Sequence, residues 1–246
     1  MRNWLISACC FCIIPNAFAD TSISFTPFQS NYKVFRNGSE VGTGKRTFYP
    51  RPDGRMYFCT ESKLKWFILS DKRKEQSWLT MTDAGNVNSL EYQYERTGTG
   101  PNKESHLIFN NGDQSLVELQ DDYPLKTKWT EDLLDPVGYQ LQMRIDVAEG
   151  KKELEYPVLY KGGRRDYKFE VVGEELLKLP IGEIHTVKLK RIRSNKKRET
   201  FVWLSKDHDF IVARIWQAKE GEEQADLRLA QFKHIDIPTQ TPEPSN

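Results

Sequence analysis

Four histidines and several acidic pairs are the residues of this chain whose types could support metal or acid–base chemistry. No pair of histidines or cysteines has the close spacing that zinc sites use. Asp207-His208-Asp209 is the most ligand-like cluster, but it lies between two expected strands, where such residues suit a hairpin turn. We therefore expect no metal site and no cofactor. The histidines are His106, His185, His208 and His234.

The nucleophile candidates are equally isolated. Ser205 lies three residues before His208, at a strand end that enters a turn, and no Gly-x-Ser-x-Gly elbow occurs. Adjacent acids such as Glu174-Glu175 point to opposite faces of a strand, so a shared acid–base site would need a special geometry, and solvated turns are the expected role. Cys59 alternates with apolar residues and is expected to be a buried structural thiol. The sequence therefore favours a protein that is not an enzyme.

Aromatic residues are the more informative chemical feature. The chain has six Trp, ten Tyr and thirteen Phe, more than a disordered chain carries. Two segments are irregular: one contains Trp66 and Phe67, and the other contains Trp129, Leu133 and Leu134. Both are candidates for lining the mouth of a curled sheet, where apolar ligands bind; packing in the core or at an interface is the favoured role for any one of these residues.

The first twenty residues have the pattern of a secretory signal peptide. Arg2 precedes an apolar run over residues 4–14, and Ala17-Phe18-Ala19 fits the cleavage pattern before Asp20. The run is shorter than the roughly 20 residues that span a bilayer. We expect a signal peptide over residues 1–19, a periplasmic location and no transmembrane span after cleavage. Cleavage leaves Cys59 as the single cysteine, so no internal disulfide forms.

The charge balance limits the kinds of partner. The formal net charge is +1, and cleavage of the signal peptide removes Arg2 and brings it to zero, which argues against a nucleic-acid binder. Residues 188–198 form a basic run. We interpret the run as a strand that alternates apolar and basic residues, followed by a solvated hairpin tip. The alternative is contact with an anionic partner such as lipid headgroups or a membrane surface.

Turn residues recur along the chain at a regular spacing. Asn37-Gly38 and Lys161-Gly162-Gly163 each separate two segments with period-two alternation, as in β-hairpins. We predict a mainly β fold in which an antiparallel sheet curls into an open barrel or sandwich. In one such hairpin Trp203 and Trp216 are expected to face one another. We expect one β-rich domain over residues 20–237 and a fraying tail over residues 238–246, rich in Pro, Thr and Ser.

One central stretch, residues 133–150, is expected to be a helix. Asp135-Pro136 suits a helix start, because Asp caps and Pro fits the first turn. The following apolar residues alternate with period two, so a strand is the alternative. As a helix near 136–147 the stretch has two apolar stripes and needs cover on two sides, which a curled sheet supplies. The stripes are Val137/Leu141/Ile145 and Tyr139/Met143/Val147.

Several motifs along the chain form a recognisable set. They are Tyr32…Gly38…Gly42, Leu133–Arg144, Tyr167-Lys168-Phe169-Glu170-Val171, Gly173-Glu174-Glu175, Leu179-Pro180-Ile181-Gly182-Glu183-Ile184-His185-Thr186-Val187-Lys188, Phe201-Val202-Trp203-Leu204-Ser205 and Phe210-Ile211-Val212-Ala213-Arg214-Ile215. Together they resemble the domain of unknown function 3108 family, which consists of exported bacterial proteins. The resemblance implies a helix over Asp135–Arg144 and assigns no catalytic residue. Relatives often have Ser shortly after the Asp, where this chain has Val137-Gly138.

Export, β architecture and surplus aromatics favour a binding module of the cell envelope. We expect it to bind an apolar or amphipathic molecule, such as a lipid, or an envelope protein. Two alternatives remain: a scaffold protein that docks on envelope assembly machinery through a strand edge, and an enzyme that acts on envelope polymers with residues from distant loops.

Overall fold

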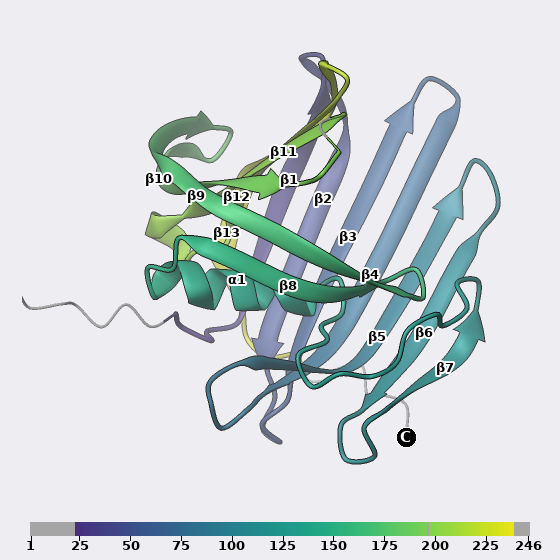
Figure 1. The fold of residues 1–246 in the computed structure, drawn as a ribbon. Coiled ribbons are helices and arrows are strands. Elements are labelled where there is room, and N and C mark those ends of the chain that lie inside the picture. Colours follow the sequence, from purple (N-terminus) through teal and green to yellow (C-terminus); the bar gives the residue numbers. More distant parts are fainter. Residues whose placement is uncertain (1–22, 196, 239–246) are drawn as a thin grey trace, which may run out of the picture.

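Most of the described part of the molecule is one antiparallel sheet of thirteen strands that curls around the helix α1 (Gly138–Ala148) (Figure 1). The computed structural model describes residues 23–195 and 197–238. The predicted signal peptide lies outside the described residues, as does nearly all of the predicted tail. The strands are β1 (Phe28–Arg36), β2 (Ser39–Pro50), β3 (Met56–Trp66), β4 (Leu69–Met81), β5 (Val87–Gly98), β6 (Lys103–Asn110), β7 (Ser115–Asp121), β8 (Glu153–Tyr160), β9 (Gly163–Leu179), β10 (Gly182–Ile192), β11 (Arg198–Ser205), β12 (Val212–Lys219) and β13 (Glu222–His234). A short 3-10 helix, η1 (Lys206–His208), follows β11.

The chain starts in the middle of the sheet, goes to one edge, crosses, and returns from the other edge. The strand order is β7-β6-β5-β4-β3-β2-β1-β13-β12-β11-β10-β9-β8. Every strand therefore lies beside its sequence neighbour, except at the crossing between β7 and β8 and at the pairing of β1 with β13. The crossing segment contains α1 and places it on the concave side of the sheet (Figure 1).

Local turn chemistry explains several of the hairpins. Asn37 and Gly38 have φ values of 49° and 79°, as a two-residue hairpin turn requires. Gly162 serves a second purpose, because a Cβ there would lie 2.0 Å from the carbonyl oxygen of Pro124 in the crossing segment. The backbone N–H of Lys126 donates to the carbonyl oxygen of Gly162 over 2.6 Å, so the crossing segment is tied to the β8–β9 hairpin.

Alternation along each strand separates a main core from a small second cluster. Phe48, Phe58 and Leu79 are buried on the concave face, within the main core. Their neighbours in sequence form a separate cluster on the opposite face, which contains Trp78 and Cys59. Burial raises the pKa of the Cys59 thiol to about 11, in line with the structural role expected for it.

The central stretch is a helix, and the predicted β wrap around it is confirmed. Leu141 is fully buried, and Met143 and Val147 on the other stripe are 3% and 6% exposed. Apolar residues alternate with period two in this stretch because both faces of the helix pack against protein. The same alternation made a strand the alternative prediction. The helix begins at Gly138 and ends at Ala148, close to the predicted range of 136–147.

Candidate functional site

A buried carboxylate fixes the start of α1 against the sheet. One oxygen of Asp135 accepts hydrogen bonds from the backbone N–H groups of Val137 and Gly138, at 2.7 and 2.8 Å. The other accepts from the hydroxyls of Ser77 on β4 and Ser89 on β5, at 2.7 and 2.6 Å. Burial raises the pKa of Asp135 although these four donors oppose the shift. The start of α1 is thereby held at a fixed place on the concave face.

Further along the helix, a buried arginine joins α1 to the opposite half of the molecule. Arg144 is 2% exposed, and its guanidinium lies 3.1 Å from a carboxylate oxygen of Asp209. The same group lies 5.1 Å from the ring centroid of Phe28 and 5.8 Å from that of Phe48. Burial lowers the pKa of Arg144 to about 10. Asp209, expected to be part of a hairpin turn, therefore helps to fix the helix.

A cavity of about 430 Å³ lies beside the start of α1, between β4–β6 and the β8–β9 turn. Its floor includes Pro136, directly before the helix, and Leu159 of β8. Arg198, at the start of β11, also lines it. The cavity thus lies between the two halves of the curled sheet, and its volume is in the range of small-molecule sites.

Tyrosines form much of the cavity wall. They come from one strand, β5, from the crossing segment and from β8. Their rings offer apolar faces with hydroxyl groups at the edge, a surface suited to amphipathic molecules. The four are Tyr92, Tyr94, Tyr123 and Tyr160.

One acidic side chain, Glu75, lies in this wall among cations. The hydroxyl of Tyr92 donates to Glu75 Oε2 over 2.7 Å. Burial raises the pKa of Glu75, while Tyr92, Arg73 and Arg46 are near enough to oppose that shift. Arg73 is held by Asp71, with Nε 2.9 Å from Oδ1.

A second group of arginines, Arg191, Arg193 and Arg198, lies around the turn between β10 and β11. The Arg191 guanidinium lies 3.6 Å from the ring centroid of Tyr167. Burial, together with the nearby charges of Arg191 and Arg198, lowers the pKa of Arg193 to about 10. Among the described residues, Arg191 Nε and Arg193 Nη1 are buried without a hydrogen-bond partner, and no carboxylate forms an ion pair with either residue.

The cavity region therefore combines aromatic faces with an excess of positive charge. Arg73, Arg96, Lys161 and Arg198 line it, against the single carboxylate of Glu75. Such a lining can hold an apolar or aromatic body by contact and a carboxylate, phosphate or sulfonate by charge-assisted hydrogen bonds.

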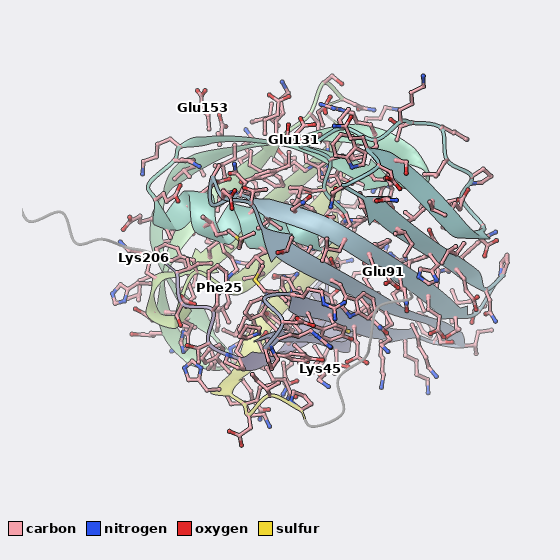
Figure 2. All side chains as sticks on the ribbon, turned by 90° about the horizontal axis from the view of Figure 1, so that it is seen from below. Phe25, Lys45, Glu91, Glu131, Glu153 and Lys206 are labelled. Atoms are coloured by element: carbon pink, nitrogen blue, oxygen red, sulfur yellow. The ribbon has the colours of Figure 1, made fainter. Side chains whose placement is uncertain are left out.

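A larger cleft of about 960 Å³ lies between the β4–β5 turn, the end of α1 and β8, and it is strongly acidic. Glu131 and Glu153, which both line it, lie on the same side of the molecule in Figure 2. Asp146 in this cleft accepts hydrogen bonds from Lys151 Nζ at 2.6 Å and from the Tyr156 hydroxyl at 2.7 Å. The described residues contain no group of three or more His, Cys, Asp or Glu arranged to hold a metal ion.

Three histidine contacts could support acid–base chemistry. One of them, between His185 Nδ1 and Asp207 Oδ1 at 3.3 Å, lies on the exposed surface. His106 Nε2 lies 2.7 Å from a carboxylate oxygen of Glu91, but Glu91 is 1% exposed and also accepts from Gln93 at 2.8 Å. Ser205 Oγ lies 3.0 Å from His208 Nδ1, and Ser205 is fully buried. Glu91 and Ser205 are therefore closed to a substrate in this conformation.

The residues predicted to line a pocket are placed in two separate regions. Phe67 lies at the tip of the β3–β4 hairpin and is 82% exposed; Trp66 ends β3, and its side chain is not among those described. Leu133 and Leu134 are buried in the main core. Trp129 is half-buried, and its Nε1 donates to Asn111 Oδ1 over 3.0 Å. The four whose side chains are described do not line one common cavity, although Leu134 borders the acidic cleft.

Sequence reasoning missed the tyrosines and arginines of the cavity. A signal was present for the arginines next to Arg198, because Arg191 and Arg193 continue the alternation of the buried Leu189 and therefore face the concave side. Polar residues at core positions of a strand mark an inner surface that is not filled by packing. The basic run itself is a strand followed by a hairpin tip, as interpreted, with Lys188 Nζ 2.7 Å from Glu175 Oε1.

Comparisons with solved structures show a barrel-like fold. A β-barrel-like protein of domain of unknown function DUF1849 from Brucella abortus matches with a TM-score of 0.56 and 9% identity, over 87% of this chain and 100% of that chain. A protein from Parabacteroides distasonis described as a lipoprotein matches with a TM-score of 0.34 and 9% identity, over 87% and 98% of the two chains. MucB matches with a TM-score of 0.35 and 13% identity, over 92% and 60%.

Two comparisons of the sequence gave different results, one without a match and one with a family. No curated protein matches the chain. Within the described residues, no helix combines the length and the apolar character needed to cross a bilayer. The pattern of the DUF3108 family, described as a protein of unknown function, matches residues 32–228. That match spans most of the chain, from β1 to β13, and the chain belongs to the DUF3108 family.

Proposed function

We propose that this protein is a non-enzymatic binding module of the periplasm that holds an amphipathic molecule with an anionic group. The observation that carries the proposal is the cavity of about 430 Å³ lined by tyrosines and by an excess of cations. A cavity bounded by both halves of the sheet offers contact on several sides, as small-molecule sites do.

The charge of the lining selects the kind of ligand. Among the described residues, no carboxylate pairs with Lys161 or Arg198 of the lining, so a neutral apolar molecule would leave both without a counter-charge, whereas an anion would supply one. Guanidinium groups suit planar, bidentate contact with carboxylate and phosphate. The tyrosine rings then contact the less polar part of the same molecule.

The periplasmic location rests on the signal-peptide pattern of residues 1–19. The non-enzymatic character rests on the closed positions of Glu91 and Ser205.

Native mass spectrometry of the protein purified from its own envelope tests the binding of a ligand directly. We expect a bound mass that organic solvent extracts and that ionises as an anion. A protein that carries no such mass, and that acquires none from a total extract of envelope lipids, would contradict the proposal.

The variant Arg198→Gln tests whether the cations of the cavity contribute to the binding of an anion. The side chain is exposed and lines the cavity, and among the described residues no carboxylate pairs with it. We expect the variant to bind anilinonaphthalene sulfonate, an aromatic anion, about tenfold more weakly, since a hydrogen bond to a charged group contributes about 1.5 kcal/mol or more. Lys197→Gln is the matched control, because Lys197 lies on the same hairpin and pairs with Glu220 at 3.5 Å.

A second candidate function, docking on envelope assembly machinery, is favoured by the free edge at β7. This strand pairs with β6 alone, and its Val117 and Leu119 are 42% and 54% exposed. Exposed strand edges can add a strand from a partner. Crosslinking in intact cells from a photoreactive residue at position 119 tests it: one stoichiometric protein partner would favour docking, and the absence of any would exclude it.

A further inference from the structure

The tip of the β3–β4 hairpin carries large apolar side chains on its outside. Ile68 is 92% exposed, Phe67 82% and Leu69 50%. Trp66 pairs with Leu69 across the hairpin, so Phe67 and Ile68 are the two turn residues. A contiguous exposed apolar group of this kind marks an interaction site on a soluble protein.

Turn geometry does not explain these residues. Phe67 has a φ of 52°, a left-handed conformation that bulky residues rarely adopt. Two-residue hairpin turns favour Asn, Asp and Gly, as the Asn37-Gly38 turn of this same sheet illustrates. Phe67 and Ile68 therefore occupy two turn positions at which local backbone preference favours Asn, Asp or Gly.

A collar of lysines lies directly behind the tip. Lys63, Lys65 and Lys72 are exposed. Lys63 and Lys72 are register partners on β3 and β4, and like charges directly opposite one another destabilise a strand pair. Among the described residues no carboxylate forms an ion pair with any of the three. The collar is thus uncompensated positive charge next to an exposed apolar tip.

We propose that the β3–β4 tip inserts into the interface of a membrane that contains anionic lipids. Ile68 and Phe67 enter the boundary between headgroups and acyl chains, and the lysine collar contacts the anionic headgroups. Apolar side chains flanked by basic residues give interfacial binding of this kind, because burial and electrostatic attraction act together. The proposal is independent of any ligand in the cavity and goes beyond the proposed function.

The tip lies beside the candidate site. A shallow groove of about 270 Å³ runs along Leu64 and Leu69 at the base of the tip, and Arg96 borders it. Arg96 also lines the tyrosine and arginine cavity. Insertion of the tip therefore brings the cavity close to the membrane surface, where an anionic amphipathic molecule could enter or leave.

The substitution pair Phe67→Asn and Ile68→Gly tests the insertion. Asn-Gly suits a two-residue hairpin turn, so the variant keeps the sheet while it loses the apolar tip. We expect co-sedimentation with vesicles of 70% phosphatidylcholine and 30% phosphatidylglycerol to fall at least tenfold relative to the unaltered protein. The matched control is Val172→Ser with Leu176→Ser on β9, which removes apolar side chains that are 45% and 57% exposed.

The collar is tested by Lys63→Gln, Lys65→Gln and Lys72→Gln, singly and together. Each should weaken binding to the anionic vesicles about fivefold at low salt, since each basic residue near such a surface contributes about 1 kcal/mol. A triple control replaces three exposed lysines elsewhere that have no ion pair among the described residues: Lys178, Lys219 and Lys233, each to Gln.

The outcomes separate this proposal from the one about the cavity. Vesicle binding by the unaltered protein that depends on the tip and the collar supports insertion. No binding to anionic vesicles, or equal binding by the Asn-Gly variant, overturns it. Anilinonaphthalene sulfonate binding by the Asn-Gly variant should be unchanged, so a failure at the membrane leaves the cavity proposal to be judged by its own measurement.

Discussion

Asp135 is a carboxylate without solvent exposure whose two oxygens each accept two hydrogen bonds. It replaces water around the first turn of α1 and ties that turn to β4 and β5. A single residue thereby places the floor of the candidate site, since Pro136 follows it directly.

Asp135→Ala should lower the free energy of unfolding by about 2–4 kcal/mol, because it leaves buried donors without an acceptor. Asp135→Asn should lower it less, since an amide oxygen can still accept from the backbone N–H groups of Val137 and Gly138. Urea titration followed by circular dichroism measures both. Equal losses of unfolding free energy in the two variants would show that the hydrogen bonds of Asp135 are not what stabilises this point of the fold.

Glu75 makes stability depend on pH. Its pKa is raised in the folded protein, so the folded state binds the proton more tightly than the unfolded chain, whose pKa is near 4.5. The destabilising contribution is complete above the folded-state pKa and disappears as the pH falls toward 4.5. Glu75→Gln should therefore be more stable than the unaltered protein at pH 8, and the difference should shrink as the pH is lowered. Thermal unfolding at several pH values checks this, and a constant difference would contradict it.

The site residues show what single-residue reasoning could and could not reach. Cys59 was placed correctly, because alternation with buried neighbours is a local pattern. Trp66 and Phe67 were chosen for being aromatic and irregular, yet Phe67 lies outside the sheet at a hairpin tip. The cavity is built by residues that meet only when the two halves of the sheet face each other, and no local pattern encodes that meeting.

At the scale of the element, α1 begins at a glycine, Gly138, whose backbone lies close to side chains of the sheet and of Asp135. A Cβ on Gly138 would lie 3.0 Å from Asp135 Oδ2, 3.0 Å from Ser89 Oγ and 3.1 Å from Leu79 Cδ2. Gly138→Ala gains helix propensity of about 1 kcal/mol, but it overpacks this point at a cost of about 1–3 kcal/mol. We expect a net loss of stability near 1 kcal/mol. Gly163→Ala is the control, since a Cβ there meets nothing within 4 Å; a stabilised Gly138→Ala variant would contradict the prediction.

Hairpins could be predicted where turn residues mark them, and were missed where they do not. Asn37-Gly38 identified one turn, whereas Phe67-Ile68 gives no signal of a turn and the β3–β4 hairpin was not predicted. The expected pair of Trp203 with Trp216 is wrong: Trp216 lies opposite Phe201, and Trp203 lies opposite Arg214. The number of turn residues between two strands sets the register, and a shift by two residues leaves the alternation pattern unchanged.

At the scale of the whole molecule, the sequence predicted a curled antiparallel sheet around one helix, and this is confirmed. The pairing of β1 with β13 could not be predicted, because nearly the whole chain separates the two strands. Their register runs from Phe28 opposite His234 to Phe35 opposite Asp226, with one irregularity beside Tyr32. The Tyr32 hydroxyl donates to the carbonyl oxygen of Val212 over 2.8 Å, which extends the connection to β12.

The β1–β13 pairing also brings the two ends of the described chain together, since the backbone N–H of Ile235 donates to the carbonyl oxygen of Pro27 over 3.1 Å. A circular permutant that joins these ends and opens at Thr127 would contain β8 to β13 followed by β1 to β7, an uninterrupted meander in which every strand follows its spatial neighbour. Its contacts would become more local, so stopped-flow refolding should be faster than that of the natural order. The natural order would then be the slower-folding of the two connectivities that this sheet allows.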